Sequence, residues 1–206
     1  MSLAWHRLSG LISPKAVDVK EFVDLYIRYW IIPLWLLAGF ADWMCHRRTH
    51  IERNAGARES VLHLAQMFEV GIPLLVALVF RINVTVMAIM VLGLILHEIT
   101  ALWDVSYARQ RRELTAFEEH VHSFLELLPI TAVTLVIGAN FDQLRALPPE
   151  PAGDRFSLTL STTSPGYLAG ALSAAVLLAG IPYCEELVRC LRYRARQAPC
   201  RQPDRQ

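Results

Sequence analysis

The sequence predicts an all-α integral membrane protein with five transmembrane helices. Hydrophobic residues make up 54% of the 206 residues, and only 19% are charged, against about 25% in an average soluble domain. The mean hydropathy is +0.34, and the apolar residues gather in long blocks. This composition, with a net charge of only +1, excludes a disordered or nucleic-acid-binding chain, because those classes are poor in apolar residues or strongly basic.

Five apolar stretches are long enough to cross a hydrocarbon core of about 30 Å, which takes about 20 residues of helix. The connection between the second and third stretches has only three residues, so these two helices are expected to be antiparallel neighbours. The five predicted spans are about 22–45, 61–80, 84–103, 121–141 and 167–190.

The segments outside the spans complete the predicted domain. Ser13-Pro14 indicates a helix start, since proline is favoured at the first helical position. We therefore expect residues 15–28 to form an N-terminal interfacial helix that leads into the first span. Residues 1–193 are expected to form a single transmembrane domain, and 194–206 a flexible cytoplasmic tail, because the last segment is rich in Arg, Gln and Pro.

The distribution of basic residues predicts the orientation. Thirteen of the 20 Lys and Arg residues follow the first, third and fifth spans, and seven lie on the other side. Cytoplasmic loops carry the excess of positive charge, so the N-terminus is expected outside and the C-terminus in the cytoplasm. Arg outnumbers Lys 18 to 2, which is typical of a GC-rich bacterial genome and indicates a multi-pass protein of the bacterial inner membrane.

The ionisable residues gather at one depth. Six of the seven histidines lie at the cytoplasmic ends of the first four spans or just beyond them, with several acidic residues nearby. An ionisable side chain inside a membrane costs several kcal/mol unless it is paired or coordinates something. Antiparallel helices bring such residues to one level only if they fall late in odd spans and early in even spans, and they do so here.

Helical phase pairs a histidine with a carboxylate on each of the first four spans. Residues three, four or seven apart share a helix face, and each pair below has one of these spacings. The predicted metal ligands are Asp42, His46, Glu59, His63, His97, Asp104, Glu119 and His122. Additional ligands or proton carriers are expected among His50, Glu118, His120 and Glu126.

The residue types indicate a dinuclear metal site. Neutral imidazole together with carboxylate suits Fe, Mn and Zn. Four carboxylates in a low dielectric repel one another strongly unless cations neutralise them, and two divalent ions, typically about 3.5–4 Å apart, would do so. The expected cofactor is a pair of divalent ions, Fe first, with Mn or Zn as alternatives.

One element of the pattern carries a resemblance. Glu119-x-x-His122 resembles the Glu-x-x-His signature of the di-iron and di-manganese carboxylate four-helix-bundle proteins. The other three spans depart from it in spacing, and Asp replaces Glu in two of them. The resemblance implies a non-haem di-iron type of site held by four of the five helices. Cys184, Glu185 and Glu186 bring the fifth span to the same depth, either in support of the site or as an ordinary helix end.

These observations favour an integral-membrane metalloenzyme at the cytoplasmic membrane boundary. The expected activity is that of an oxidoreductase of the oxygenase type, with a hydrophobic, lipid-soluble substrate from the bilayer and an electron donor at the cytoplasmic face. Hydrolysis by two zinc ions would use the same ligands. Two other readings stay open: a membrane b-type cytochrome with bis-histidine haem, and a metal transporter or sensor. The haem ligands would be His46, His63, His97 and His122.

Overall fold

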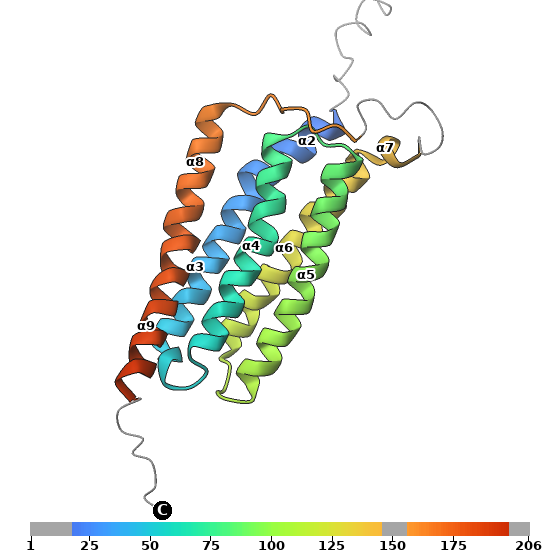
Figure 1. Ribbon diagram of the computed structural model, residues 1–206. Helices are drawn as coiled ribbons and strands as arrows, with labels where there is room; N and C mark the ends of the chain where they lie inside the picture. Colours follow the sequence, from blue (N-terminus) through green and yellow to red (C-terminus); the bar gives the residue numbers. More distant parts are fainter. Residues whose placement is uncertain (1–17, 146–155, 198–206) are drawn as a thin grey trace, which may run out of the picture.

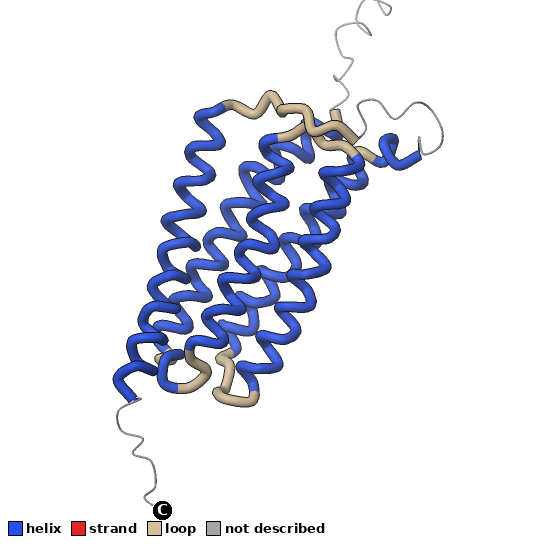
Figure 2. The backbone as a smooth tube through the Cα atoms, viewed as in Figure 1, coloured by secondary structure: helices blue, strands red, loops and turns tan. Residues whose placement is uncertain are grey.

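The computed structural model describes residues 18–145 and 156–197, and this part of the chain is almost entirely helical (Figure 2). Its one β-type pairing is an isolated bridge between Phe80 and Leu160. Five helical segments are long and apolar enough to span a membrane, which confirms the predicted number. They run side by side in Figure 1. The segments are Val19–Arg48, Ala57–Val79, Val84–Arg109, Ala116–Ala139 and Pro165–Gln197.

The first segment is one continuous helical run of three parts. It comprises α2 (Val19–Tyr26), the π-helical turn η1 (Ile27–Ile31) and α3 (Ile32–Arg48). The wide turn of η1 lies directly before Pro33, whose missing N–H interrupts ordinary α-helical bonding. The helix expected over 15–28 is helical from Val19 in its described part and leads through η1 into the first span, as predicted. Its interfacial position stays a prediction, and residues 15–17 lie outside the described residues.

The next three segments are α4 (Ala57–Val79), α5 (Val84–Arg109) and α6 (Ala116–Ala139). Side-chain caps start two of them: Asn83 accepts from the N–H of Val86, and Thr115 accepts from the N–H of Glu118. Such caps satisfy helix N–H groups that have no intrahelical partner. The antiparallel neighbours α4 and α5 pack along their lengths, as the three-residue connection predicted.

The fifth segment contains α8 (Pro165–Ala175), the π-helical turn η3 (Val176–Gly180) and α9 (Ile181–Gln197). The short helix α7 (Phe141–Arg145) lies at the same end of the molecule as α2 (Figure 1). No residue of α8 is buried, whereas α9 packs against α3 and α4. This packing brings the fifth span to the end of the molecule where α3 ends.

Apolar and polar residues separate along the length of the molecule. The main hydrophobic core includes Ile31, Leu36, Met90 and Val133. At the other end, where α3 and α5 finish and α4 and α6 begin, many buried side chains are polar or charged. Buried polar residues there include Asp42, His46, Glu59, Ser60, His63, Asp104, Glu118 and Glu186.

Candidate metal centre

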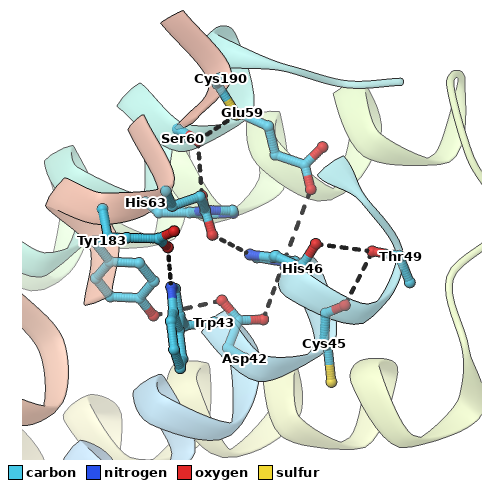
Figure 3. Close-up of polar contacts among 12 residues, drawn as sticks. Asp42, Trp43, Cys45, His46, Thr49, Glu59, Ser60, His63, Tyr183 and Cys190 are labelled. Atoms are coloured by element: carbon cyan, nitrogen blue, oxygen red, sulfur yellow. Dashed lines mark hydrogen bonds and ion pairs between the residues drawn. The ribbon is translucent and has the colours of Figure 1, made fainter. Parts of the chain in front are cut away.

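Five helices and one loop contribute to a buried cluster of ionisable side chains. Figure 3 shows the part of it around Asp42, His46, Glu59 and His63. These side chains are at most 11% exposed. We define the polar cluster as Asp42 and His46 of α3, Glu59 and His63 of α4, Asp104 of α5, Arg112 of the following loop, Glu118 and His122 of α6, and Glu186 of α9.

Glu186 fixes the orientation of two histidines. Its Oε2 accepts a hydrogen bond from Nδ1 of His46 at 3.0 Å, and its Oε1 accepts one from Nδ1 of His63 at 2.9 Å. The hydroxyl of Ser60 donates to the same Oε1 at 2.8 Å. Because the carboxylate accepts at both Nδ1 atoms, a neutral ring at either position carries its free lone pair on Nε2. Carboxylates commonly hold metal-ligating histidines in this way.

The two Nε2 atoms face carboxylates of other helices. Nε2 of His46 lies 3.4 Å from Oδ1 of Asp42 and 3.3 Å from Oε1 of Glu118. Nε2 of His63 lies 3.2 Å from Oδ2 of Asp104. Nε2 of His122 lies 2.9 Å from Oδ1 of Asp42. With metal–ligand distances of about 2.0–2.2 Å, ligands of one ion are about 3.0–3.4 Å apart. The observed separations therefore suit atoms that share an ion.

Several buried atoms of the polar cluster have no hydrogen-bond partner within the described residues. Leaving such an atom unsatisfied costs about 1–3 kcal/mol, so a group of them at one place marks a site that can take a ligand. The donor set, imidazole nitrogen and carboxylate oxygen, fits Fe, Mn or Zn. The atoms are Nε2 of His46, Nε2 of His63, Oε2 of Glu59, Oδ1 of Asp104 and Oε2 of Glu118.

The buried charges of the polar cluster are strongly unbalanced. It contains five carboxylates and one guanidinium, which gives −4 when the carboxylates are ionised and the histidines neutral. Two divalent cations would neutralise this charge. Buried charges without compensation are costly, so the balance favours two ions over one.

Arg112 closes the end of the polar cluster that faces the loop between α5 and α6. Its Nη2 donates to Oε1 of Glu59 at 2.6 Å and to Oε1 of Glu118 at 2.5 Å. Burial acts to lower the pKa of this guanidinium, but the hydrogen bonds and charges of the two glutamates outweigh burial and raise it further above its usual range. Each glutamate thus holds the arginine with one oxygen, and its other oxygen, Oε2, has no hydrogen-bond partner among the described residues.

The structure brings six of the eight predicted ligands together and separates two. Asp42, His46, Glu59, His63, Asp104 and His122 lie in the polar cluster. The expectation that Glu119 faces this centre is corrected: its side chain is 50% exposed and pairs with Arg109, while Glu118 occupies the buried position. The expectation for His97 is also corrected, because its Nε2 donates to the carbonyl oxygen of Leu125 at 3.3 Å. Seven residues correspond to about 10.5 Å along a helix, which puts His97 at another depth than Asp104.

The four additional predicted residues have different positions. Glu118 is fully buried in the polar cluster. Glu126 lies one turn from His122 and lines the cavity beside the cluster. His120 is exposed and contacts the ring of Phe124. His50 is 58% exposed and lies near Glu52, outside the cluster.

The sequence pattern predicts no role for Arg112 and Tyr183, and it leaves Glu186 either in support of the site or at an ordinary helix end. The hydroxyl of Tyr183 donates to the carbonyl oxygen of Gly39 at 3.2 Å and lies 3.4 Å from Oδ2 of Asp42. Spacing could have pointed to Tyr183 and Glu186, since these two residues are three apart on one helix face. The fifth helix therefore takes part in the site, which four helices were expected to form.

Comparisons of the chain with protein-family models, with curated proteins and with solved structures found no match. The residues of the polar cluster and their geometry are therefore the basis on which a function is inferred.

Proposed function

We propose that the protein is an integral-membrane metalloenzyme with a dinuclear centre of histidine and carboxylate ligands. The observation that carries the proposal is the polar cluster itself, where five buried carboxylates face three histidines and a single arginine. Bound divalent ions would satisfy both the excess negative charge and the unpaired Nε2 and carboxylate oxygen atoms.

Two overlapping groups of side chains supply the ligands. Asp42, His46, Glu118 and His122 form one group whose ligand atoms all lie within 4.8 Å of one another, and His46, Glu59 and His63 form another. Asp104 extends the second group, because its Oδ2 lies 3.2 Å from Nε2 of His63. His46 belongs to both groups, so two ions would be close neighbours, as in carboxylate-bridged dinuclear sites.

The proposed activity is that of an oxidoreductase of the oxygenase type, with iron as the first choice of metal. When bound, a pair of iron ions supplies dioxygen activation, and manganese or zinc are alternatives with the same ligands. Glu186 holds the two imidazoles in place, Tyr183 donates to the region of Asp42, and Arg112 covers the end of the cluster that is proposed to face the cytoplasm. Helices α3–α6 and α9 exclude bulk water from these groups.

The haem alternative has less support than the metal centre. The rings of His46 and His63 lie stacked with centroids 4.3 Å apart and planes at 10°. A haem between two axial histidines needs one ring on each face of the porphyrin, and this stack leaves no room for one. One carboxylate, that of Glu186, also binds Nδ1 of both rings and holds them next to each other.

The proposal includes the membrane setting. Five spanning helices place the polar cluster at the end that bears the arginine-rich connections, so we propose a bacterial inner-membrane protein with the N-terminus outside and the C-terminus in the cytoplasm. A lipid-soluble substrate would then enter from the bilayer, and an electron donor would approach the cytoplasmic face. A C-terminal reporter that behaves as external would contradict this orientation.

Elemental analysis with an optical spectrum tests the metal centre directly. Protein purified in detergent without chelator is expected to hold about two Fe, Mn or Zn ions per chain and to show no Soret band. A His63→Ala variant is expected to insert in the membrane and lose metal, whereas His120→Ala, a change at an exposed histidine of α6, is expected to retain it. A Soret band would show bound haem and would assign the histidines as haem ligands. Absence of both metal and haem would overturn the proposal.

A further inference from the structure

A small cavity joins the polar cluster to the apolar interior. It has a volume of about 40 Å³, and Asp42, His63, Asp104 and His122 line one part of it. The rest of its wall includes Trp35, Gln66, His97, Ala101 and Leu125. A molecule in this cavity would lie beside the proposed ligands, yet most of its contacts would be with residues that belong to no proposed ligand group.

Three polar side chains of this wall have a buried atom without a hydrogen-bond partner in the described part of the chain. These atoms are Nε1 of Trp35, Nε2 of Gln66 and Nδ1 of His97. The indole and amide nitrogens are donors. The ring of His97 donates from Nε2 to the carbonyl oxygen of Leu125 and also lies near the backbone carbonyl of Gln66, so its Nδ1 is assigned no part in binding the ligand. The wall thus offers two donors, from Trp35 and Gln66, which complement an oxygen atom that accepts hydrogen bonds.

A second cavity borders the same tryptophan and lies closer to the end of the molecule that holds α2. Its volume is about 50 Å³, and Trp35 lines both cavities. Its wall is apolar except for Glu69, and it includes Val70, Leu94 and Val133. Pro73 and Pro129 also line it, and prolines within membrane helices free backbone space by kinking. This second cavity suits a hydrocarbon segment.

The volumes of the two cavities and the charges of their walls restrict the class of molecule that they can bind. An apolar cavity of about 150 Å³ accepts benzene, so cavities of 40 and 50 Å³ favour a narrow chain over a ring. Among the described residues, neither cavity is lined by Lys or Arg, while Asp42, Asp104 and Glu126 line the first. Bound metal ions would compensate Asp42 and Asp104, but Glu126 belongs to no proposed ligand group. Because no Lys or Arg in the described wall can pair with an anionic head, an uncharged oxygen fits better than a carboxylate.

We infer that the two cavities bind an uncharged, unbranched aliphatic molecule with a hydroxyl or carbonyl oxygen at one end. The oxygen lies between Trp35 and Gln66, beside the polar cluster, and the first carbons of the chain pass Trp35 into the apolar cavity. That this molecule is the substrate or product of the centre rests on the proposed function. Its binding does not, because the donors to its oxygen come from Trp35 and Gln66 and not from a metal.

Photo-crosslinking in phosphatidylcholine nanodiscs tests the inference. The probes are four medium-chain compounds with the same diazirine in the chain: a primary alcohol, an aldehyde, a carboxylate and an alkane. The alcohol or the aldehyde is expected to label peptides of α3, α4 and α5 that line the cavities, and the stronger of the two identifies the oxygen as hydroxyl or carbonyl. Equal labelling of these peptides by the alkane or the carboxylate would overturn the inference.

Two substitutions localise the site. Trp35→Phe keeps the ring and removes the N–H, and it is expected to weaken competition by the unlabelled alcohol about tenfold, since an unpaired buried acceptor costs on that order. The matched control is Trp30→Phe, because Trp30 is 61% exposed on the same helical run. If Trp35→Phe does not fold, Gln66→Leu tests the second donor. Wild-type affinity in the folded variant, or an equal loss in Trp30→Phe, contradicts the inference.

The same labelling after chelator treatment separates this inference from the proposed function. Retained labelling in metal-free protein supports the binding site whatever the metal analysis gives. If the protein proves to contain no metal and still labels with the oxygen-bearing probes, the proposed function fails and the binding site stands. If the protein contains two metal ions and the alkane labels these peptides equally, the proposed binding site fails and the proposed metal centre stands.

Discussion

The imidazole rings of His46 and His63 are stacked, with centroids 4.3 Å apart and planes at 10°. They come from α3 and α4, and the carboxylate of Glu186 from α9 binds Nδ1 of each ring. Two adjacent imidazolium rings would repel each other, whereas two neutral rings in this arrangement both present Nε2 to the interior. Glu186 thus determines which nitrogen of each ring is available as a ligand.

Glu186→Gln should therefore weaken metal binding. A glutamine has one acceptor oxygen and one donor nitrogen, so it cannot accept from both Nδ1 atoms, and one ring changes its tautomer or its orientation. We expect metal affinity to fall about 10–100-fold, the usual effect of losing such a supporting carboxylate, as measured by competition with a chelator. Glu185→Gln is the matched control, because Glu185 contacts Trp43 and Arg47 and not the histidines. An unchanged affinity in Glu186→Gln would contradict the role given to Glu186.

Adjacent glutamates at the start of α6 offer a second comparison. Glu118 is fully buried, with Oε1 3.3 Å from Nε2 of His46, whereas Glu119 is half-exposed beside Arg109. We expect Glu118→Gln to lower the metal content of the purified protein from about two ions per chain to about one or fewer. Glu119→Gln should leave the metal content unchanged. If only Glu119→Gln lost metal, Glu119 would be the ligand in place of Glu118, as the Glu-x-x-His spacing predicts.

The same pair shows how far the sequence could predict the site. Hydropathy gave the five helices, and the alternation of antiparallel spans gave the common depth of Asp42, His46, Glu59 and His63. Spacing could not choose between Glu118 and Glu119, because residues three and four before His122 both share its face. Rotation of α6 about its axis decides between them, and that rotation depends on the packing of α6 against α3 and α5.

Long-range contacts account for the other differences. Glu186 is more than 120 residues from both histidines in the sequence, and only the packing of α9 against α3 and α4 brings it to them. In the sequence, Arg112 is only one of several arginines predicted to be cytoplasmic. Its role follows from the loop after α5, which brings it to Glu59 and Glu118. His97 shares a helix face with Asp104, but two helical turns separate their depths.

The ion pair of Glu52 with Arg189 predicts a pH-dependent contribution to stability. Burial acts to raise the pKa of Glu52, but a backbone hydrogen bond and the Arg189 charge outweigh it and lower the pKa below its ordinary value of 4.5. A carboxyl whose pKa is lower in the folded protein stabilises it above the ordinary value, and this stabilisation is lost as the pH falls through the lowered value.

Glu52→Gln should therefore lower the free energy of unfolding by about 0.5–1 kcal/mol near neutral pH. The difference from the wild type should shrink as the solution is made strongly acidic. Thermal unfolding in detergent across this pH range measures it. Glu113→Gln, a change at an exposed carboxylate of the same end, should show a smaller effect at neutral pH. A Glu52→Gln deficit that grows towards acidic pH would contradict the assignment.

The close approach of α4 and α5 gives the last prediction. A Cβ on Gly93 would collide with Cγ of Pro73 and lie 2.5 Å from the carbonyl oxygen of Glu69, so the two helices depend on a residue without a side chain, as is common between membrane helices. Gly93→Ala should force the helices apart and lower the free energy of unfolding by about 1–3 kcal/mol. Gly71→Ala, on α4 with open space around its Cβ, should be neutral or stabilising, because alanine favours helix by up to about 1 kcal/mol.

Separation of α4 from α5 should also reach the metal centre. His63 is on α4 and Asp104 is on α5, and their facing atoms are 3.2 Å apart, so a shift between the helices changes the spacing of two proposed ligands. Gly93→Ala should therefore reduce metal affinity as well as thermal stability, while Gly71→Ala should affect neither adversely. If Gly93→Ala were as stable as Gly71→Ala, the tight α4–α5 contact would be wrong. If it lost stability but bound metal as the wild type does, the centre would not depend on the register of these two helices.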